Sequence, residues 1–389
     1  MLALALATWA MLAAPARTAM TVTRDETNHS LKKGDHPLPV HIGGRVAVSP
    51  LAPPAPKGAR AYVHQWPAVY WEAAFVGDRL LLKFDDDKNE YRFTIDGAAA
   101  MPLAQPGRAE VVVTGLGPGR HRVRLDKVTE SVDFARTFNG FFVPRGETAL
   151  PPPPPRSRQI EFIGDSGMTG YGIRSDTRKC TKEEVRLRTD SGAAWPSLVA
   201  RSIDADYQIN AMSGRGLVRN YGGTEPEDVM SALYPRTLPG GTAVWQNPSW
   251  HPQVVVALLF NDFATAIRPG ERWPDQIALA GNYVRAYQQF IATIHERSPG
   301  ATLVLPWPDL AKSNDASVRQ LGSNAQDAIR AAAANAGILR IEFPSLPDFT
   351  PENTACDYHG SRSDHRYLAE WMTGWLKARP ELWAAPRPR

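Results

Sequence analysis

A single serine stands where a run of buried-type residues gives way to a glycine-rich turn. Residues 159–163 form an apolar run suited to a buried strand, and Gly164-Asp165-Ser166 follows at once. Open α/β sheets place their chemistry at the carboxyl ends of their strands. A serine hydroxyl there becomes a nucleophile only when a base takes its proton and another group orients that base. The motif indicates acyl transfer if the chain supplies those partners.

His359 is the candidate for the base. It lies in a Cys-Asp-Tyr-His sequence, in a loop expected between the last strand and the last helix, and such loops often carry catalytic residues. Asp357 is close enough in sequence to hold the imidazole tautomer or to stabilise its positive charge. Structural roles suit the other histidines of this half, which are His251, His295 and His365.

Two further strand ends carry groups that could stabilise an oxyanion. Gly214 follows the expected strand 207–211 and leaves its N–H accessible, and Asn261 follows the expected strand 254–260 with an amide. Taken singly, the first suits a plain turn and the second a helix cap. Ser166, Gly214 and Asn261 at three successive strand ends indicate one site. We expect the N–H groups of Ser166 and Gly214 and the Asn261 side chain to form an oxyanion hole.

The periodicity of the chain changes at a run of five prolines, residues 151–155. Before it, short β-favouring runs are separated by glycine-rich turns, which predicts a β-sandwich. The prolines form a stiff spacer. After it, strands alternate with helices expected at 195–203, 275–296, 318–336 and 363–377, which predicts a mostly parallel sheet covered on both faces. The predicted boundaries are 36–147 for the sandwich, 148–158 for the linker and 159–380 for the α/β domain.

In this order, Ser166, Gly214, Asn261 and His359 match the four blocks that name the SGNH (GDSL-like) hydrolases. More narrowly, the chain resembles carbohydrate esterase family 2, which couples an N-terminal jelly-roll sandwich to a C-terminal SGNH domain. The other matching stretches are 66–72, 96–97, 119–121, 138–141, 164–166, 170–172, 213–216 and 357–359. The resemblance implies a flavodoxin-like, three-layer α/β domain. It also implies a serine esterase without cofactor that deacetylates sugars or plant-wall polysaccharides such as xylan and glucomannan.

Two positions depart from the family pattern. The third block normally reads Gly-x-Asn-Asp, but Leu259 stands at the glycine position and could narrow the pocket beside the oxyanion. The fourth block normally reads Asp-x-x-His, but Cys356 stands at the aspartate position. Some family members resemble a Ser-His dyad whose histidine is held by a backbone carbonyl. Both Asp357 and a backbone carbonyl therefore stay candidates to orient His359.

Three aromatic residues could stack on sugar rings. Trp245 and Trp250 are expected in loops of the second domain, and Tyr221 follows the glycine block. Packing in the core or at an interface is the alternative for each. The sandwich could bind glycan as well, or it could only brace the second domain.

The composition limits location and partners. Residues 1–19 are apolar and end in small residues, which predicts a signal peptide and a secreted or periplasmic protein. No later stretch could span a bilayer. In an oxidising compartment Cys180 and Cys356 could pair, or they could stay two buried thiols. A net charge of +4 without a basic block argues against nucleic acid. We expect a monomer, and no ligand spacing calls for a metal.

Competing functions stay open. An ordinary α/β-hydrolase is disfavoured because the chain contains no Gly-x-Ser-x-Gly elbow. A lipase or thioesterase on the same scaffold would prefer longer acyl chains. A non-catalytic glycan-binding protein would show no hydrolysis that depends on Ser166.

Overall fold

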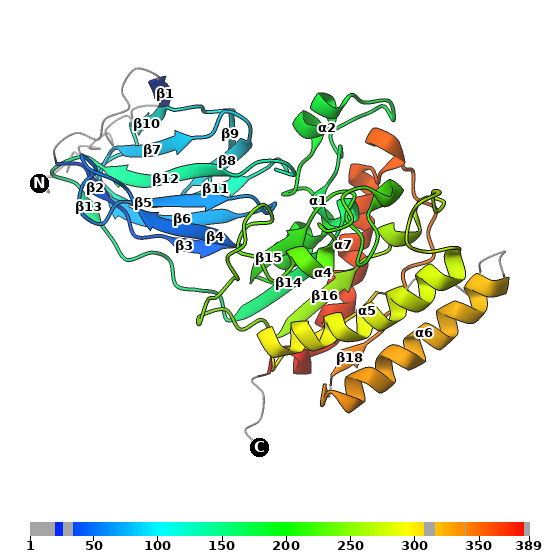
Figure 1. The fold of residues 1–389 in the computed structure, drawn as a ribbon. Coiled ribbons are helices and arrows are strands. Elements are labelled where there is room, and N and C mark those ends of the chain that lie inside the picture. Colours follow the sequence, from blue (N-terminus) through cyan, green and yellow to red (C-terminus); the bar gives the residue numbers. More distant parts are fainter. Residues whose placement is uncertain (1–19, 26–33, 307–315, 339, 385–389) are drawn as a thin grey trace, which may run out of the picture.

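The computed structural model describes residues 20–25, 34–306, 316–338 and 340–384. A β-sandwich precedes an α/β domain (Figure 1), which confirms the predicted fold class. Residues 1–19, predicted as a signal peptide, lie outside the described residues. Among the helices that are described, none combines the length and the apolar character that crossing a bilayer would require.

Two antiparallel sheets form the sandwich. Along β8 and β11 buried side chains alternate with more exposed ones, because one face of each strand packs on the core. The first sheet holds β1 (Thr21–Asp25), β10 (Glu110–Thr114), β7 (Leu80–Asp85), β12 (Arg136–Val143), β5 (Arg60–His64), β4 (Val46–Pro50) and β2 (His36–Pro37). The second holds β13 (Thr148–Ala149), β6 (Tyr70–Val76), β11 (Arg120–Lys127), β8 (Glu90–Ile95), β9 (Met101–Ala104) and β3 (His41–Gly43).

The α/β domain is built on five parallel strands. Their order is β15 (Ala205–Ala211), β14 (Arg158–Gly164), β16 (Val254–Leu258), β17 (Thr302–Val304) and β18 (Ile341–Glu342). Numbered within the domain, this is the 2-1-3-4-5 order of flavodoxin-like sheets. Ligands bind such sheets at the carboxyl edge, where the strand order reverses between the first and third strands. Here those strands are β14 and β16.

Helices cover both faces of this sheet (Figure 1). On one face, α3 (Trp195–Ser202) and α7 (Arg362–Lys377) pack against Phe162 and its neighbours. On the other, α5 (Gln276–Arg297) contributes to a second cluster, and α6 (Ala316–Asn335) packs beside it. Among the described residues, the short α-helices are α1 (Ser166–Thr169), α2 (Lys182–Arg188) and α4 (Met230–Leu233).

Buried polar contacts join the two domains. The Arg45 guanidinium, in the turn before β4, forms an ion pair with Glu161 of β14 at 2.8 Å, and both side chains are about 1% exposed. Trp66 donates its indole N–H to the Thr237 carbonyl at 3.1 Å. One apolar cluster runs continuously from the sandwich to α5. The sandwich and the α/β domain therefore share a core.

A second group of polar contacts lies at the start of β15. His41, Glu72 and Asp206 approach closely enough to hold a cation. Arg156, from the linker, donates to Glu72 at 2.9 Å and to Asp206 at 2.8 Å. Tyr70 also donates to Asp206, at 2.6 Å. The guanidinium thus supplies the positive charge that these carboxylates require.

Candidate active site

Strand register brings three of the predicted site residues to one edge of the sheet. Gly164, the last residue of β14, lies opposite Ala211 of β15 and Leu258 of β16. Ser166, Gly214 and Asn261 follow these three strand ends within two or three residues. All three are partly exposed. They therefore share the carboxyl edge of the sheet, beside the point where its strand order reverses.

Ser166 and His359 are in direct contact. His359 Nε2 lies 2.8 Å from Ser166 Oγ, and His359 Nδ1 lies 3.0 Å from the carbonyl oxygen of Cys356. A carbonyl can only accept, so Nδ1 carries the proton and the neutral ring accepts the serine O–H at Nε2. This tautomer leaves Nε2 ready to take the serine proton.

Asp357 does not contact the imidazole in the way that a triad aspartate would. Its carboxylate accepts the Tyr171 hydroxyl at 2.8 Å, and its side chain is exposed. The Tyr171 ring stacks on the His359 ring, with centroids 4.1 Å apart and planes 29° apart. The carbonyl of Cys356 and the face of Tyr171 hold the imidazole between them.

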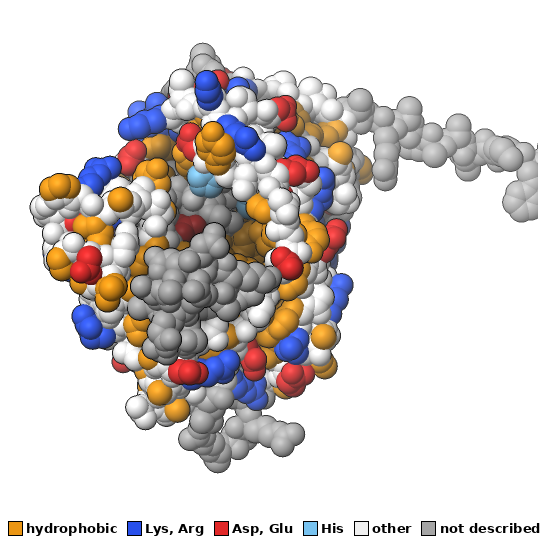
Figure 2. Space-filling model, turned by 90° about the vertical axis from the view of Figure 1, so that its right-hand side faces the viewer, with side chains coloured by type: hydrophobic (Ala, Val, Ile, Leu, Met, Phe, Trp, Pro, Cys, Tyr) orange, Lys and Arg blue, Asp and Glu red, His pale blue; other side chains and the backbone are white. Residues whose placement is uncertain are grey.

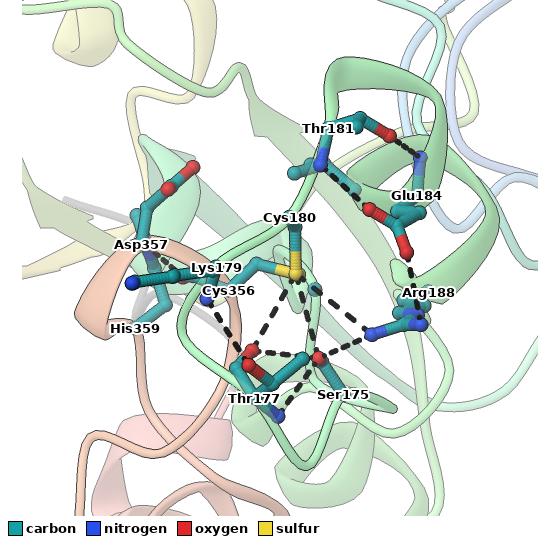
Figure 3. Close-up of a disulfide and its surroundings, with 12 residues drawn as sticks. Ser175, Thr177, Lys179, Cys180, Thr181, Glu184, Arg188, Cys356, Asp357 and His359 are labelled. Carbon is teal, nitrogen blue, oxygen red and sulfur yellow. Dashed lines mark hydrogen bonds and ion pairs between the residues drawn. A yellow bond between two sulfur atoms is a disulfide. The ribbon is translucent and has the colours of Figure 1, made fainter.

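The loop that presents His359 is held by a disulfide (Figure 3). Cys180 and Cys356 are bonded, and the Asp357 N–H donates to the Arg178 carbonyl at 2.8 Å. Asp357 and Tyr358 both have left-handed backbones, with φ of 52° and 63°. Such values are costly for residues other than glycine and persist only where surrounding contacts impose them.

A glycine lets the loop approach the turn after α1. Gly172 has φ +57°, and a Cβ there would lie 2.5 Å from the Cβ of Cys356. The Gly-Tyr-Gly sequence around Tyr171 therefore serves two purposes. It lets the disulfide loop come close, and it sets the tyrosine ring against the imidazole.

The electrostatics keep the base neutral. Burial lowers the pKa of His359, while the hydrogen bond to Cys356 and the charge of Asp357 oppose that shift without cancelling it. His365 of α7 is more deeply buried, and burial lowers its pKa to about 4. Its Nδ1 accepts the N–H of Trp195 at 3.2 Å, which is the structural role that its position suggested.

The loop that carries Gly214 is fixed by a buried carboxylate. Asp262, directly after Asn261, accepts the N–H groups of Leu217, Val218 and Arg219 at 2.7 to 2.8 Å. Burial raises its pKa to about 6. Gly214 has φ +78° and open space where a side chain would stand. The two strand-end loops are thus tied together with the Gly214 backbone accessible.

The aromatic candidates separate into two groups. Tyr221 is 57% exposed, and its N–H donates to the Gly214 carbonyl at 2.8 Å, so it stands beside the site. Trp245 and Trp250 lie in the loop before β16, at the amino edge of the sheet. There they line a separate pocket of about 250 Å³ with Arg297. The structure does not bring these two tryptophans to Ser166.

The surroundings of the site are largely apolar. A pocket of about 310 Å³ is lined by Gly167 and Gly360, the neighbours of Ser166 and His359, together with residues such as Phe349 and Trp371. In the view of Figure 2 the α/β domain is hollowed, with a histidine and apolar side chains around the hollow. Leu259, which could have narrowed this region, is fully buried in the core.

Sequence reasoning missed three contributors. Tyr171 belongs to the Gly170-Tyr171-Gly172 motif, but nothing in the sequence indicates that its ring contacts the base. Asp262 is the residue after Asn261, and nothing in the sequence showed that three backbone N–H groups converge on it. Glu130, from the sandwich, accepts hydrogen bonds from Ser213, and no motif marked it.

Two family models match the chain in succession. Residues 55–153 match the carbohydrate esterase 2 N-terminal family, and residues 162–368 match the GDSL-like lipase/acylhydrolase family. An acetylxylan esterase/glucomannan deacetylase of Cellvibrio japonicus (strain Ueda107) is 40% identical over 352 residues. That alignment covers 89% of this chain and 93% of the relative.

Solved structures agree with these matches. One is a carbohydrate esterase whose active site is described as displaying divergent catalytic and non-catalytic binding functions. It is 37% identical, has a TM-score of 0.79, and the match covers 90% of this chain and all of that one. A family two carbohydrate esterase from Clostridium thermocellum, solved with cellohexaose, shares the fold at 24% identity and a TM-score of 0.70. That match covers 89% of this chain and all of that one.

Proposed function

The chain belongs to carbohydrate esterase family 2, a family of carboxylic ester hydrolases, and we propose that it removes O-acetyl groups from sugars or plant-wall polysaccharides. The contact between Ser166 and His359 at 2.8 Å carries the proposal. The 40% identical relative, named for acetylxylan and glucomannan, supports these as substrates. The protein acts as a monomer, and its partner is the acetylated glycan.

The mechanism is acyl transfer through Ser166. His359 Nε2 takes the hydroxyl proton while Ser166 Oγ forms a bond to the acetyl carbonyl carbon. The N–H groups of Ser166 and Gly214, with the Asn261 amide, donate to the resulting oxyanion. The bond to the sugar oxygen then breaks, and that oxygen receives the proton from His359.

Water completes the cycle. His359 takes a proton from a water molecule, whose oxygen attacks the acetyl carbonyl carbon of the acyl-serine. The bond to Ser166 Oγ breaks, acetate leaves, and the proton returns to the serine. Throughout, the carbonyl of Cys356 accepts from His359 Nδ1, so it plays the orienting part that an aspartate plays in a triad. Asp357 influences His359 only indirectly: it accepts the hydroxyl of Tyr171, whose ring stacks on the imidazole, and its negative charge stabilises the imidazolium.

Export is part of the proposal. Disulfides form and persist in oxidising compartments. The bond between Cys180 and Cys356 lies beside the proposed base, so an exported, secreted or periplasmic location suits the assembled site.

The first experiment measures acetate released from acetylated xylan and acetylated glucomannan. Wild type is compared with Ser166→Ala and with Ser202→Ala, which removes a serine hydroxyl from α3 away from the site. We expect Ser166→Ala to lower kcat by roughly 10⁵-fold or more and Ser202→Ala to leave it unchanged.

Other outcomes would redirect the assignment. Turnover of long-chain aryl esters with no acetate release would indicate a lipase-type activity. Binding of the glycans by wild type, without hydrolysis of any ester, would indicate a non-catalytic glycan-binding protein.

A further inference from the structure

A carboxylate of the sandwich reaches the loop that carries Gly214. Glu130 follows β11, and its side chain lies among residues of the α/β domain. One carboxylate oxygen accepts the Ser213 N–H at 2.7 Å and the other accepts the Ser213 hydroxyl at 2.6 Å. Glu130 is only 7% exposed. Both carboxylate oxygens thus accept hydrogen bonds from Ser213, the residue that immediately precedes Gly214.

The backbone on both sides of Glu130 is held by hydrogen bonds within the sandwich. Its neighbours Thr129 and Ser131 both donate to the Asn89 amide oxygen, at 3.0 and 2.8 Å, and all three are fully buried. Thr129 also accepts the N–H of Glu90 at 2.9 Å. These contacts lie within the sandwich, so Glu130 is held in place independently of the loop that it contacts.

The contact extends to the nucleophile. Thr169, the last residue of α1, shares a hydrogen bond with Ser213 Oγ at 3.1 Å, and its hydroxyl lies 3.3 Å from the Ser166 carbonyl. Because Ser213 gives its hydroxyl proton to Glu130, the single Thr169 hydroxyl proton is shared between Ser213 Oγ and the Ser166 carbonyl. Glu130 thus fixes a hydroxyl that lies against the group in contact with the Ser166 backbone. Hydrogen bonds to a charged acceptor are shorter and stronger than neutral ones, so the two bonds from Ser213 to Glu130 are the strongest of these contacts.

We propose that Glu130 is a positioning residue for the esterase reaction. By holding both polar groups of Ser213, it sets the orientation of the next peptide and so aims the Gly214 N–H at the oxyanion. The sandwich is then part of the catalytic assembly and does more than brace it. This inference rests on the proposed function, because the oxyanion is that of ester hydrolysis.

The test compares three substitutions at Glu130 by kcat, KM and thermal midpoint, with an aryl acetate as substrate. Glu130→Gln can still accept the Ser213 N–H and can donate to its hydroxyl, so we expect kcat within about threefold of wild type. Glu130→Leu removes both acceptors. We expect kcat to fall about 10- to 100-fold with KM nearly unchanged, because a misplaced donor weakens binding of the transition state alone.

Glu130→Asp covers the case in which the leucine variant fails to fold. It keeps the charge but is one methylene shorter, so it cannot hold both groups of Ser213, and we expect kcat to fall about tenfold. The matched control is Asp206→Asn, which changes another buried carboxylate between the domains, at the amino end of β15. We expect it to lower the thermal midpoint and leave kcat unchanged.

The outcomes separate the two proposals. An active wild type with unchanged kcat in Glu130→Asp, and in Glu130→Leu if it folds, would overturn the positioning role and leave the esterase assignment standing. An equal fall in kcat for Asp206→Asn would also overturn it, since the effect would then be one of general stability. A wild type inactive on every ester would overturn both.

Discussion

At the scale of single residues, the pairing of His359 with a carbonyl decides how the base behaves. A carboxylate at Nδ1 would stabilise the imidazolium strongly, whereas the Cys356 carbonyl offers only a dipole. The Asp357 carboxylate, whose charge acts on His359, accepts the Tyr171 hydroxyl and is exposed to solvent. The site therefore combines a partly buried base with weak charge compensation.

The pH dependence should reflect this environment. Because burial lowers the pKa of His359, the neutral form needed for catalysis persists to lower pH than for an ordinary histidine. We expect the acidic limb of kcat/KM to have an apparent pKa below 6.5. In Asp357→Asn the limb should move lower still, because removing a negative charge destabilises the imidazolium. A limb above 6.5 in wild type would contradict this.

The role of Asp357 can be separated from that of a triad aspartate. Asp357→Asn keeps an oxygen that accepts the Tyr171 hydroxyl and leaves the Cys356 carbonyl in place. We expect kcat at neutral pH to fall less than about tenfold, whereas replacing a true triad aspartate by asparagine costs about 10⁴-fold. A loss above 10³-fold would restore Asp357 as the partner that orients the base.

Tyr171 offers a matched pair of variants. Tyr171→Phe keeps the ring on His359 and loses only the bond to Asp357, so kcat should stay within about threefold. Tyr171→Ala removes the ring and frees the imidazole to turn, and we expect a fall of at least tenfold. Equal kcat values for the two would show that the stacked ring does not hold the base.

The sequence placed Ser166, Gly214 and Asn261 just beyond the ends of three strands, because strand patterns predict where strands end. It also placed His359 in the segment between the last strand and the last helix. It left two candidates to orient His359. The choice depends on two consecutive left-handed backbones, at Asp357 and Tyr358, which no motif in the sequence predicted. This backbone conformation is imposed by contacts with residues far away in the sequence, such as Cys180 and Arg178. A local sequence pattern contains no information about such contacts.

At the scale of elements, the disulfide joins the loop of the base to the segment before α2. It spans 176 residues of sequence. Replacing both Cys180 and Cys356 by alanine should lower the free energy of unfolding by about 3–5 kcal/mol, because the unfolded chain regains that freedom.

The same variant should lose activity as well as stability. The Cys356 carbonyl accepts a hydrogen bond from His359 Nδ1, so freeing Cys356 loosens the base. We expect kcat, measured well below the thermal midpoint, to fall severalfold. Denaturant titration and kinetics measure the two effects separately. A stability loss with unchanged kcat would show that the loop keeps its shape without the bond.

The long helices were predictable and the short ones were not. The expected helices at 195–203, 275–296, 318–336 and 363–377 correspond within a few residues to α3, α5, α6 and α7, since each has an apolar face. By contrast, α2 buries no residue and is fixed by a capping box between Thr181 and Glu184. Trp245 and Trp250 lie in a loop of the second domain, as expected, but that loop precedes β16. Loops before and after a strand look alike in sequence, so the sequence did not indicate at which edge of the sheet they lie.

At the scale of the whole molecule, the ion pair between Arg45 and Glu161 tests how far the domains depend on each other. Arg45→Met leaves the Glu161 carboxylate buried without its ion-pair partner, although the Asn210 amide and, at 3.5 Å, the Trp250 N–H still donate to it. We expect the free energy of unfolding to fall by about 3–5 kcal/mol. At temperatures where the variant stays folded, kcat should not change.

The double variant Arg45→Met/Glu161→Met supplies the control. With both charges gone, no uncompensated carboxylate is buried, and we expect much of the lost stability to return. Denaturant titration of the three proteins measures this. Equal losses in the single and double variants would show that the packing around Arg45 matters more than its charge.

The Glu130 contact has a consequence for how such proteins diversify. A linker of five prolines resembles a joint at which evolution, or a protein engineer, could exchange one module for another. However, Glu130 of the sandwich must accept hydrogen bonds from Ser213 of the α/β domain. Recombination at the linker would combine domains from different parents, in which these two loops have not been selected to fit each other. The two halves should be inherited together, and a chimaera should recover full turnover only when the loop around Glu130 and the loop around Ser213 come from the same parent.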